Sequence, residues 1–240
     1  MKVSPLITLA FDQKVGNMNF PIQQALALNN SALLHFHNGN LDEAYPLLRQ
    51  ATAILRDHTD PEKALSHGDQ ISQDPHKPSL WLSPVDSQLD IEQFQDKSSS
   101  YMFHQGIYLN GDVSGTDSCE TVCAVVLFNM ALTRHMKALA SDSATTRMQY
   151  EGTSKIYKMA LCMLAKLTVV TPSSELLAVA ALNNTCRIAD SVSDTEEVTR
   201  HCVAMRNILA SPSSNRDDVF SFFYLNMLYF QAKCTTASAA

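Results

Sequence analysis

Glycine and proline are scarce in this 240-residue chain, which contains only 7 of the first and 9 of the second. A many-stranded sandwich or barrel needs turn-forming residues at short intervals, so this shortage disfavours such folds and favours helices. Hydrophobic residues make up 45% of the sequence. A chain of this length can bury about 70% of its unfolded surface, in one large domain or two small ones.

Clustered positive charge and long apolar runs are also lacking. The 18 Lys and Arg residues are scattered, and the net charge is -6. A phosphate-binding surface needs clustered basic residues, so we expect neither nucleic acid nor an anionic membrane as a partner. No apolar run approaches 18 residues, and the stretch from Pro5 to Phe11 is too brief for a secretory signal. We therefore expect no membrane span.

Six cysteines are present, and four of them lie inside apolar helical patterns. In a long chain without a secretory signal, this arrangement favours reduced, buried thiols over a disulfide set. The expected location is the cytoplasm, with the nucleus as an alternative.

The stretch "IQQALALNNSALLHFH" (22–37) has helical apolar spacing rather than alternation. Gly39 can end that helix in a left-handed conformation, and Asn40 can cap a second helix over about 41–57. Two helices joined by so tight a turn run antiparallel and pack together. Ala32 and Ala44 are small where the two backbones would cross.

This hairpin resembles a tetratricopeptide repeat (TPR), a 34-residue unit with small residues in both helices and Gly at the turn. The family's small positions fall on Ala32, Gly39, Ala44 and Ala51, and its large positions on Leu28, His35 and Leu48. Ser31 and Arg56 depart from the pattern, because the family prefers Leu and Pro there.

The same Leu/Phe-Asn signature recurs at one helical phase in four segments, at Asn30, Asn129, Asn184 and Asn226. The resemblance implies a mainly α fold, a TPR-like array of antiparallel helix pairs forming a single domain over 1–240. Its expected parts are an N-terminal segment 1–21, repeat 1 at 22–57, an insertion 58–118, repeat 2 at 119–167, repeat 3 at 173–210 and a C-terminal capping helix 215–234. Second helices are expected over about 146–167 and 194–210, the latter capped by Asp194.

The insertion 58–118 is rich in Pro, Ser, Asp and Gln, so its first half is predicted to be a loop, with a short helix near 87–95. "YMFHQGIYL" (101–109) is aromatic and β-branched, which predicts a strand. "LITLAF" (6–11) is the obvious second strand of a small two-stranded ribbon. A long insertion before "VLFNMAL" is also similar to TPR-like proteins of algae.

The resemblance implies binding on the inner surface of the array, by a protein or peptide partner. The implied residues are Leu26, Asn29, Leu33, Phe36, His37, Val125, Phe128, Leu132, His135, Met136, Ala180, Asn183, Arg187, Asp190 and Ser191, with Phe222, Leu225 and Tyr229 on the final helix. This largely apolar surface suits an apolar or amphipathic peptide or helix, or one of the protein's own segments. Simple core packing is the alternative explanation. The basic clamp with which some TPR domains hold a carboxylate terminus is not matched here.

The four recurrent asparagines have two interpretations. They could form a functional ladder, or each could donate to unpaired carbonyls at the end of the preceding helix. The second, structural interpretation is favoured.

No motif for nucleophilic catalysis, phosphate binding or dinucleotide binding is present. Cys119 and Cys123 lie one turn apart without a second close pair, so neither a metal nor another cofactor is expected. The leading hypothesis is a non-enzymatic protein–protein interaction scaffold. The alternatives are an interaction module autoinhibited by its own 58–118 insertion and, less favoured, an enzyme of unrecognised type that uses His104, Cys119 or His135.

Overall fold

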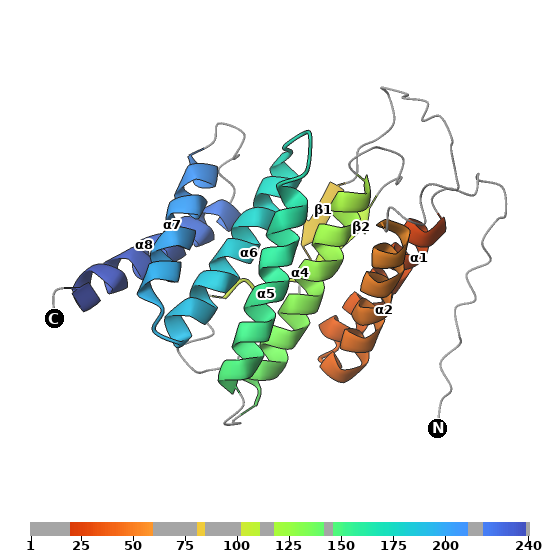
Figure 1. Ribbon diagram of the computed structural model, residues 1–240, viewed down its shortest axis with the longest axis horizontal. Coiled ribbons are helices and arrows are strands. Elements are labelled where there is room, and N and C mark those ends of the chain that lie inside the picture. Colours follow the sequence, from red (N-terminus) through yellow and green to blue (C-terminus); the bar gives the residue numbers. More distant parts are fainter. Residues whose placement is uncertain are drawn as a thin grey trace.

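The computed structural model describes residues 20–59, 81–84, 102–110, 118–141, 146–210 and 218–238, and this part of the chain is mainly helical, as predicted (Figure 1). Its elements are α1 (Phe20–His37), α2 (Leu41–Thr59), β1 (Trp81–Pro84), β2 (Ile107–Asn110), α4 (Ser118–Leu139), α5 (Thr146–Leu164), α6 (Pro172–Ser191), α7 (Thr195–Leu209) and α8 (Asp218–Ser238). The predicted helix ranges agree with the observed ones to within about four residues.

The helices pack as sequence-adjacent pairs, α1 with α2, α4 with α5 and α6 with α7. Neighbouring pairs contact each other, and α8 packs against α7 and α6 at the far end of the row (Figure 1). Small side chains allow the first pair to approach closely, since Ala32, Ala44 and Ala51 are fully buried. The expected hairpin over 22–57 is thus confirmed.

The corner of that hairpin forms as its sequence predicts. Gly39 adopts a φ of 75°, which a side chain would disfavour. Its amide donates to the Phe36 carbonyl at 3.0 Å, and the next amide donates to the His35 carbonyl at 2.9 Å. The cap at Asp194 is confirmed as well, because its carboxylate accepts a hydrogen bond of 3.0 Å from the Glu197 amide.

The predicted two-stranded ribbon exists, and its strands in the described part of the chain are β1 and β2. β2 pairs antiparallel with β1, in a register that places Trp81 opposite Asn110 and Pro84 opposite Ile107. β1 lies where the sequence predicted a loop, because a four-residue strand ending in Pro is too short to show alternation. The predicted strand at 6–11 and helix at 87–95 lie outside the described residues.

α4 runs through the centre of the core. By length and composition alone, Cys119–Leu139 would be long and apolar enough to cross a membrane, but 78% of its most apolar window is buried inside the protein. A helix packed on several sides must be apolar nearly all round, so its central position accounts for its composition.

Candidate functional site

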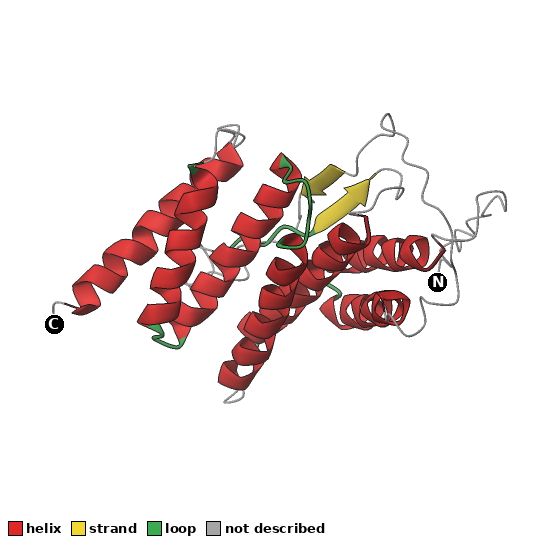
Figure 2. Ribbon diagram, turned by 45° about the horizontal axis from the view of Figure 1, so that its top comes forward, coloured by secondary structure: helices red, strands yellow, loops and turns green. Residues whose placement is uncertain are grey.

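An extended segment of the insertion, residues 102–109, lies along one side of the helical row. We call it the inner segment, and the side formed by α1, α4 and α6 the inner face. The segment runs from α6 past α4 to β2, which contacts α1 (Figure 2). Its apolar side chains are almost fully buried, with exposed fractions of 5% for Phe103 and 0% for Ile107. The inner face is therefore covered by the protein's own chain along much of its length.

Two asparagines hold the backbone of the inner segment at points four residues apart. The Phe103 amide donates to Asn184 Oδ1 and Asn184 Nδ2 donates to the Phe103 carbonyl, both at 2.8 Å. Asn129 makes the same two contacts with the amide and carbonyl of Ile107, both at 2.9 Å. A carboxamide carries one acceptor and two donors, so it can satisfy both polar groups of one peptide residue. These contacts involve the backbone of the inner segment and are independent of its side chains.

Further asparagine–asparagine hydrogen bonds connect α4 to α1 and α8 to α6. Asn129 Nδ2 donates to Asn29 Oδ1 at 2.8 Å, and Asn226 Nδ2 donates to Asn183 Oδ1 at 2.9 Å. Asn184 adds a bond of 3.0 Å to the Tyr157 hydroxyl. Burial raises the pKa of that hydroxyl, so it stays protonated and accepts with its oxygen lone pair.

The predicted partners of the recurrent asparagines are wrong for Asn129 and Asn184. Their carboxamides bond to the inner segment and not to the terminal carbonyls of the preceding helix. A structural role is nevertheless consistent with their burial, since both have exposed fractions of at most 1%.

Side-chain contacts give the inner segment a defined register. The Phe103 ring lies 5.3 Å from the Phe223 ring and 6.3 Å from the Phe128 ring, centroid to centroid. A Cβ on Gly106 would come within 2.5 Å of the Leu33 Cδ2 atom, so only glycine fits without movement there. The face thus accepts an aromatic residue, then a glycine three positions on, directly followed by an aliphatic residue.

Most residues predicted to bind a partner are buried, and some of them contact the inner segment. The buried ones are Leu26, Asn29, Leu33, Phe36, Val125, Phe128, Leu132, His135, Met136, Ala180 and Asn183. His37, Arg187, Asp190 and Phe222 are partly exposed, and Ser191, Leu225 and Tyr229 are exposed. Partner binding at these residues stays a prediction. Phe103, Gly106 and Ile107 are not among the predicted site residues, although their segment is predicted to be extended.

His135 sits under the inner face as a neutral imidazole. Burial, with a smaller contribution from the charge of Arg187, lowers the pKa of His135 to about 3. Its ring meets those of Tyr150 and Tyr157 edge-on, at centroid distances of 5.6 and 6.2 Å. Its Nδ1 atom is buried and has no hydrogen-bond partner among the residues described.

The residues considered for catalysis do not form one site in the described part of the chain. His104 Nδ1 lies 3.3 Å from the Met102 carbonyl, whereas Cys119 lines a separate cavity on α4 with Cys123. No three His, Cys, Asp or Glu residues within the described ranges are placed to hold a metal ion. All six cysteines are free thiols. The inner face carries carboxamides and buried apolar side chains, and the inner segment is packed against them.

Comparisons with protein-family models, curated proteins and solved structures found no match.

Proposed function

We propose that this chain is a non-enzymatic protein–protein interaction module, a TPR-like array whose inner face binds an extended polypeptide. The observation that carries the proposal is the pair of contacts by which Asn129 and Asn184 bind backbone N–H and C=O groups four residues apart. Backbone recognition of this kind supplies affinity for any extended segment, while the adjacent pockets select its side chains.

Support for the array comes from the matching positions of its small residues. Ala32, Ala131 and Cys186 occupy the same place relative to the recurrent asparagine on α1, α4 and α6, and all are fully buried. On the paired helices, Ala44, Ala160 and Cys202 are similarly buried. Small residues at such positions let neighbouring helices pack closely in a regular order.

One observation favours the alternative in which the binding face is autoinhibited by the protein's own insertion. The inner segment already fills the face, so the partner would be a segment of like chemistry that replaces it. The competing partner should carry an aromatic residue at the Phe103 position, a glycine or another small residue at the Gly106 position and an aliphatic residue at the Ile107 position. Met102 and Leu109 are buried as well, so apolar residues are expected at their positions too.

Rescue in trans tests the proposal. Phe103→Ala empties the aromatic pocket and should lower the free energy of unfolding by about 3–5 kcal/mol. A synthetic peptide with the sequence of residues 101–110 should then raise the melting temperature of the variant in a concentration-dependent way, because it binds the native state. A peptide with Ala at the Phe103 position should not.

Two controls make the result specific. A peptide altered only at the half-buried His104 position should rescue as well as the parent, and a scrambled peptide should fail. If the folded variant shows no rescue, the inner face is permanent core and the proposal is wrong. If the variant does not fold alone, refolding it with the parent peptide and with the Ala peptide gives the same comparison: only the parent should yield a folded complex.

A further inference from the structure

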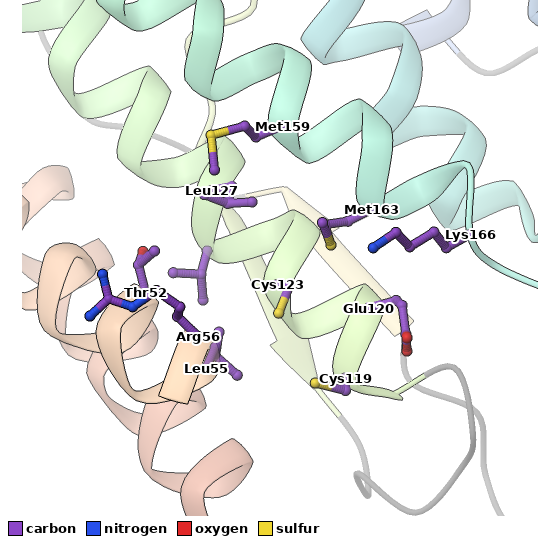
Figure 3. Close-up of a pocket in the computed structure, with 11 residues that line it drawn as sticks. Thr52, Leu55, Arg56, Cys119, Glu120, Cys123, Leu127, Met159, Met163 and Lys166 are labelled. Atoms are coloured by element: carbon purple, nitrogen blue, oxygen red, sulfur yellow. The ribbon is translucent and has the colours of Figure 1, made fainter. Parts of the chain in front are cut away.

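A cavity of about 410 Å³ lies between α2, α4 and α5, and four of its lining residues contain sulfur. Cys119 and Cys123 come from the first turns of α4, and Met159 and Met163 come from α5 (Figure 3). Neither the inner segment nor the proposed function uses this cavity. It brings two thiols and two thioethers to one place.

The two thiols can act on a single ligand. They lie one helical turn apart, and Figure 3 shows both sulfur atoms on the same side of α4. Side chains four residues apart are neighbours on the surface of a helix, and both thiols line the same cavity, so both can reach one ligand there.

The two thioethers are not equivalent. Met163 projects toward the thiol pair across the cavity, whereas Met159 lies one turn away beside Leu127 (Figure 3). Met159 is also 50% exposed. Met163 is therefore the candidate third sulfur ligand, and Met159 offers a matched control of the same chemistry.

Two side chains of opposite charge line the cavity, Lys166 and Glu120. The buried Oε2 atom of Glu120 has no hydrogen-bond partner among the described residues. Arg56 also lines the cavity, but its guanidinium is paired with the Asp57 carboxylate at 3.6 Å. These charges largely cancel, so the choice of ion depends on the sulfur ligands.

The type and number of ligands then indicate the ion. Soft sulfur ligands select Cu(I), zinc or iron–sulfur clusters. Structural zinc takes four nitrogen, oxygen or thiolate ligands and iron–sulfur clusters take four cysteines, so two thiolates with one thioether suit Cu(I) best. We propose that this cavity binds one Cu(I) ion through the thiolates of Cys119 and Cys123, with the thioether of Met163 as third ligand. The ion enters and stays as Cu(I), the two thiol protons leave to solvent, and the complex carries one net negative charge.

The test is a titration of the full-length reduced chain with Cu(I), without oxygen and against a chromophoric Cu(I) chelator. One equivalent should bind. Cys119→Ala and Cys123→Ala should each weaken binding by at least about 100-fold and Met163→Leu by about 10-fold, since loss even of an outer-shell partner costs 10- to 100-fold. Affinity should rise by about 10- to 100-fold per pH unit near neutrality, because up to two protons are released.

Matched controls separate this site from the other thiol pair. Cys186 and Cys202 have sulfur atoms 3.7 Å apart, but both are almost fully buried. The double variant Cys186→Ala/Cys202→Ala and the single variant Met159→Leu should bind Cu(I) as the natural chain does. Absence of Cu(I) binding, unchanged binding by Cys123→Ala, or loss of binding in the Cys186/Cys202 variant would each overturn the proposal. Cys119→Ser and Cys123→Ser, with unchanged far-ultraviolet circular dichroism, exclude misfolding as the cause of a loss.

Discussion

The centre of the helical row and its ends carry the same sequence signature in different surroundings. α4 and α8 both place an asparagine after a large apolar residue, at Phe128-Asn129 and Leu225-Asn226. Phe128 is fully buried, whereas Leu225 is 65% exposed, because α4 has neighbours on several sides and α8 ends the row. Local sequence sets the helix and the phase of its asparagine, and position in the row decides how much of the helix becomes core.

The largest difference between centre and end should appear when a leucine is truncated. Leu132→Ala on α4 removes a fully buried side chain and should lower the free energy of unfolding by about 2–5 kcal/mol. Leu228→Ala on α8, where the side chain is 42% exposed, should change it by about 0.5 kcal/mol or less. Urea denaturation measures both. Equal losses would mean that α8 is covered to the same degree as α4.

Substituting Asn129 on the central helix α4 should cost more stability than substituting Asn30 on the outer helix α1. Asn129→Leu leaves the amide and carbonyl of Ile107 without the carboxamide, and each buried group left unpaired costs about 1–3 kcal/mol. Asn30 on α1 is only partly buried and accepts one bond of 3.2 Å from Asn29, so Asn30→Leu should cost about 1 kcal/mol or less. Chemical denaturation of the two variants side by side is the measurement. A larger loss for Asn30→Leu would contradict the account in which Asn129 holds the backbone of the inner segment.

Lowering the pH should destabilise the fold by protonating His135, which is buried on the central helix α4. Its pKa falls from 6.5 in the unfolded chain to about 3 in the fold, so the unfolded state binds the proton first. The stability that this neutral imidazole supports is present above pH 6.5 and is lost as the pH falls from there toward 3, at about 1.4 kcal/mol per pH unit. Between pH 6.5 and 5 the loss should be about 2 kcal/mol.

Denaturant titrations of the natural chain and of His135→Gln across this pH range isolate the effect of that one imidazole. The variant should show a shallower loss of stability between pH 6.5 and 5. Identical pH profiles would show that His135 is accessible to protons in the folded state.

The smallest expected effect comes from the Tyr157 hydroxyl, which accepts a hydrogen bond from the Asn184 carboxamide. Tyr157→Phe removes the acceptor for one Asn184 N–H while keeping the buried ring, so the loss should be about 1 kcal/mol. Thermal denaturation at a fixed pH checks it. A loss as large as that expected for Asn129→Leu would mean that the hydroxyl orients the whole carboxamide.

The sequence predicted what depends on nearby residues. Helix periodicity placed α1 and α7 to within two residues, and the chemistry of Gly39 and Asp194 marked a helix end and a helix start correctly. Such signals act over one or two helical turns, so a single sequence contains them in full.

The inner face could not be predicted in the same way. Asn184 and Phe103 are 81 residues apart, and the four-residue β1 has no periodicity of its own. The helical phase of the asparagines was visible, but their partners lay in an insertion whose path no local signal fixes. For that reason the helical phase of Asn129 and Asn184 could be predicted, but their hydrogen-bond partners could not.

Native-state hydrogen exchange tests the central claim most directly, because it asks whether the inner segment opens while the helical row stays folded. The amides of Phe103 and Ile107, both bound to asparagine side chains, are compared with that of Leu132 in the middle of α4. We predict that the first two exchange through local opening, at a lower free energy than Leu132. Exchange of all three only through global unfolding would show that the segment is an inseparable part of the core, and would contradict a displaceable occupant.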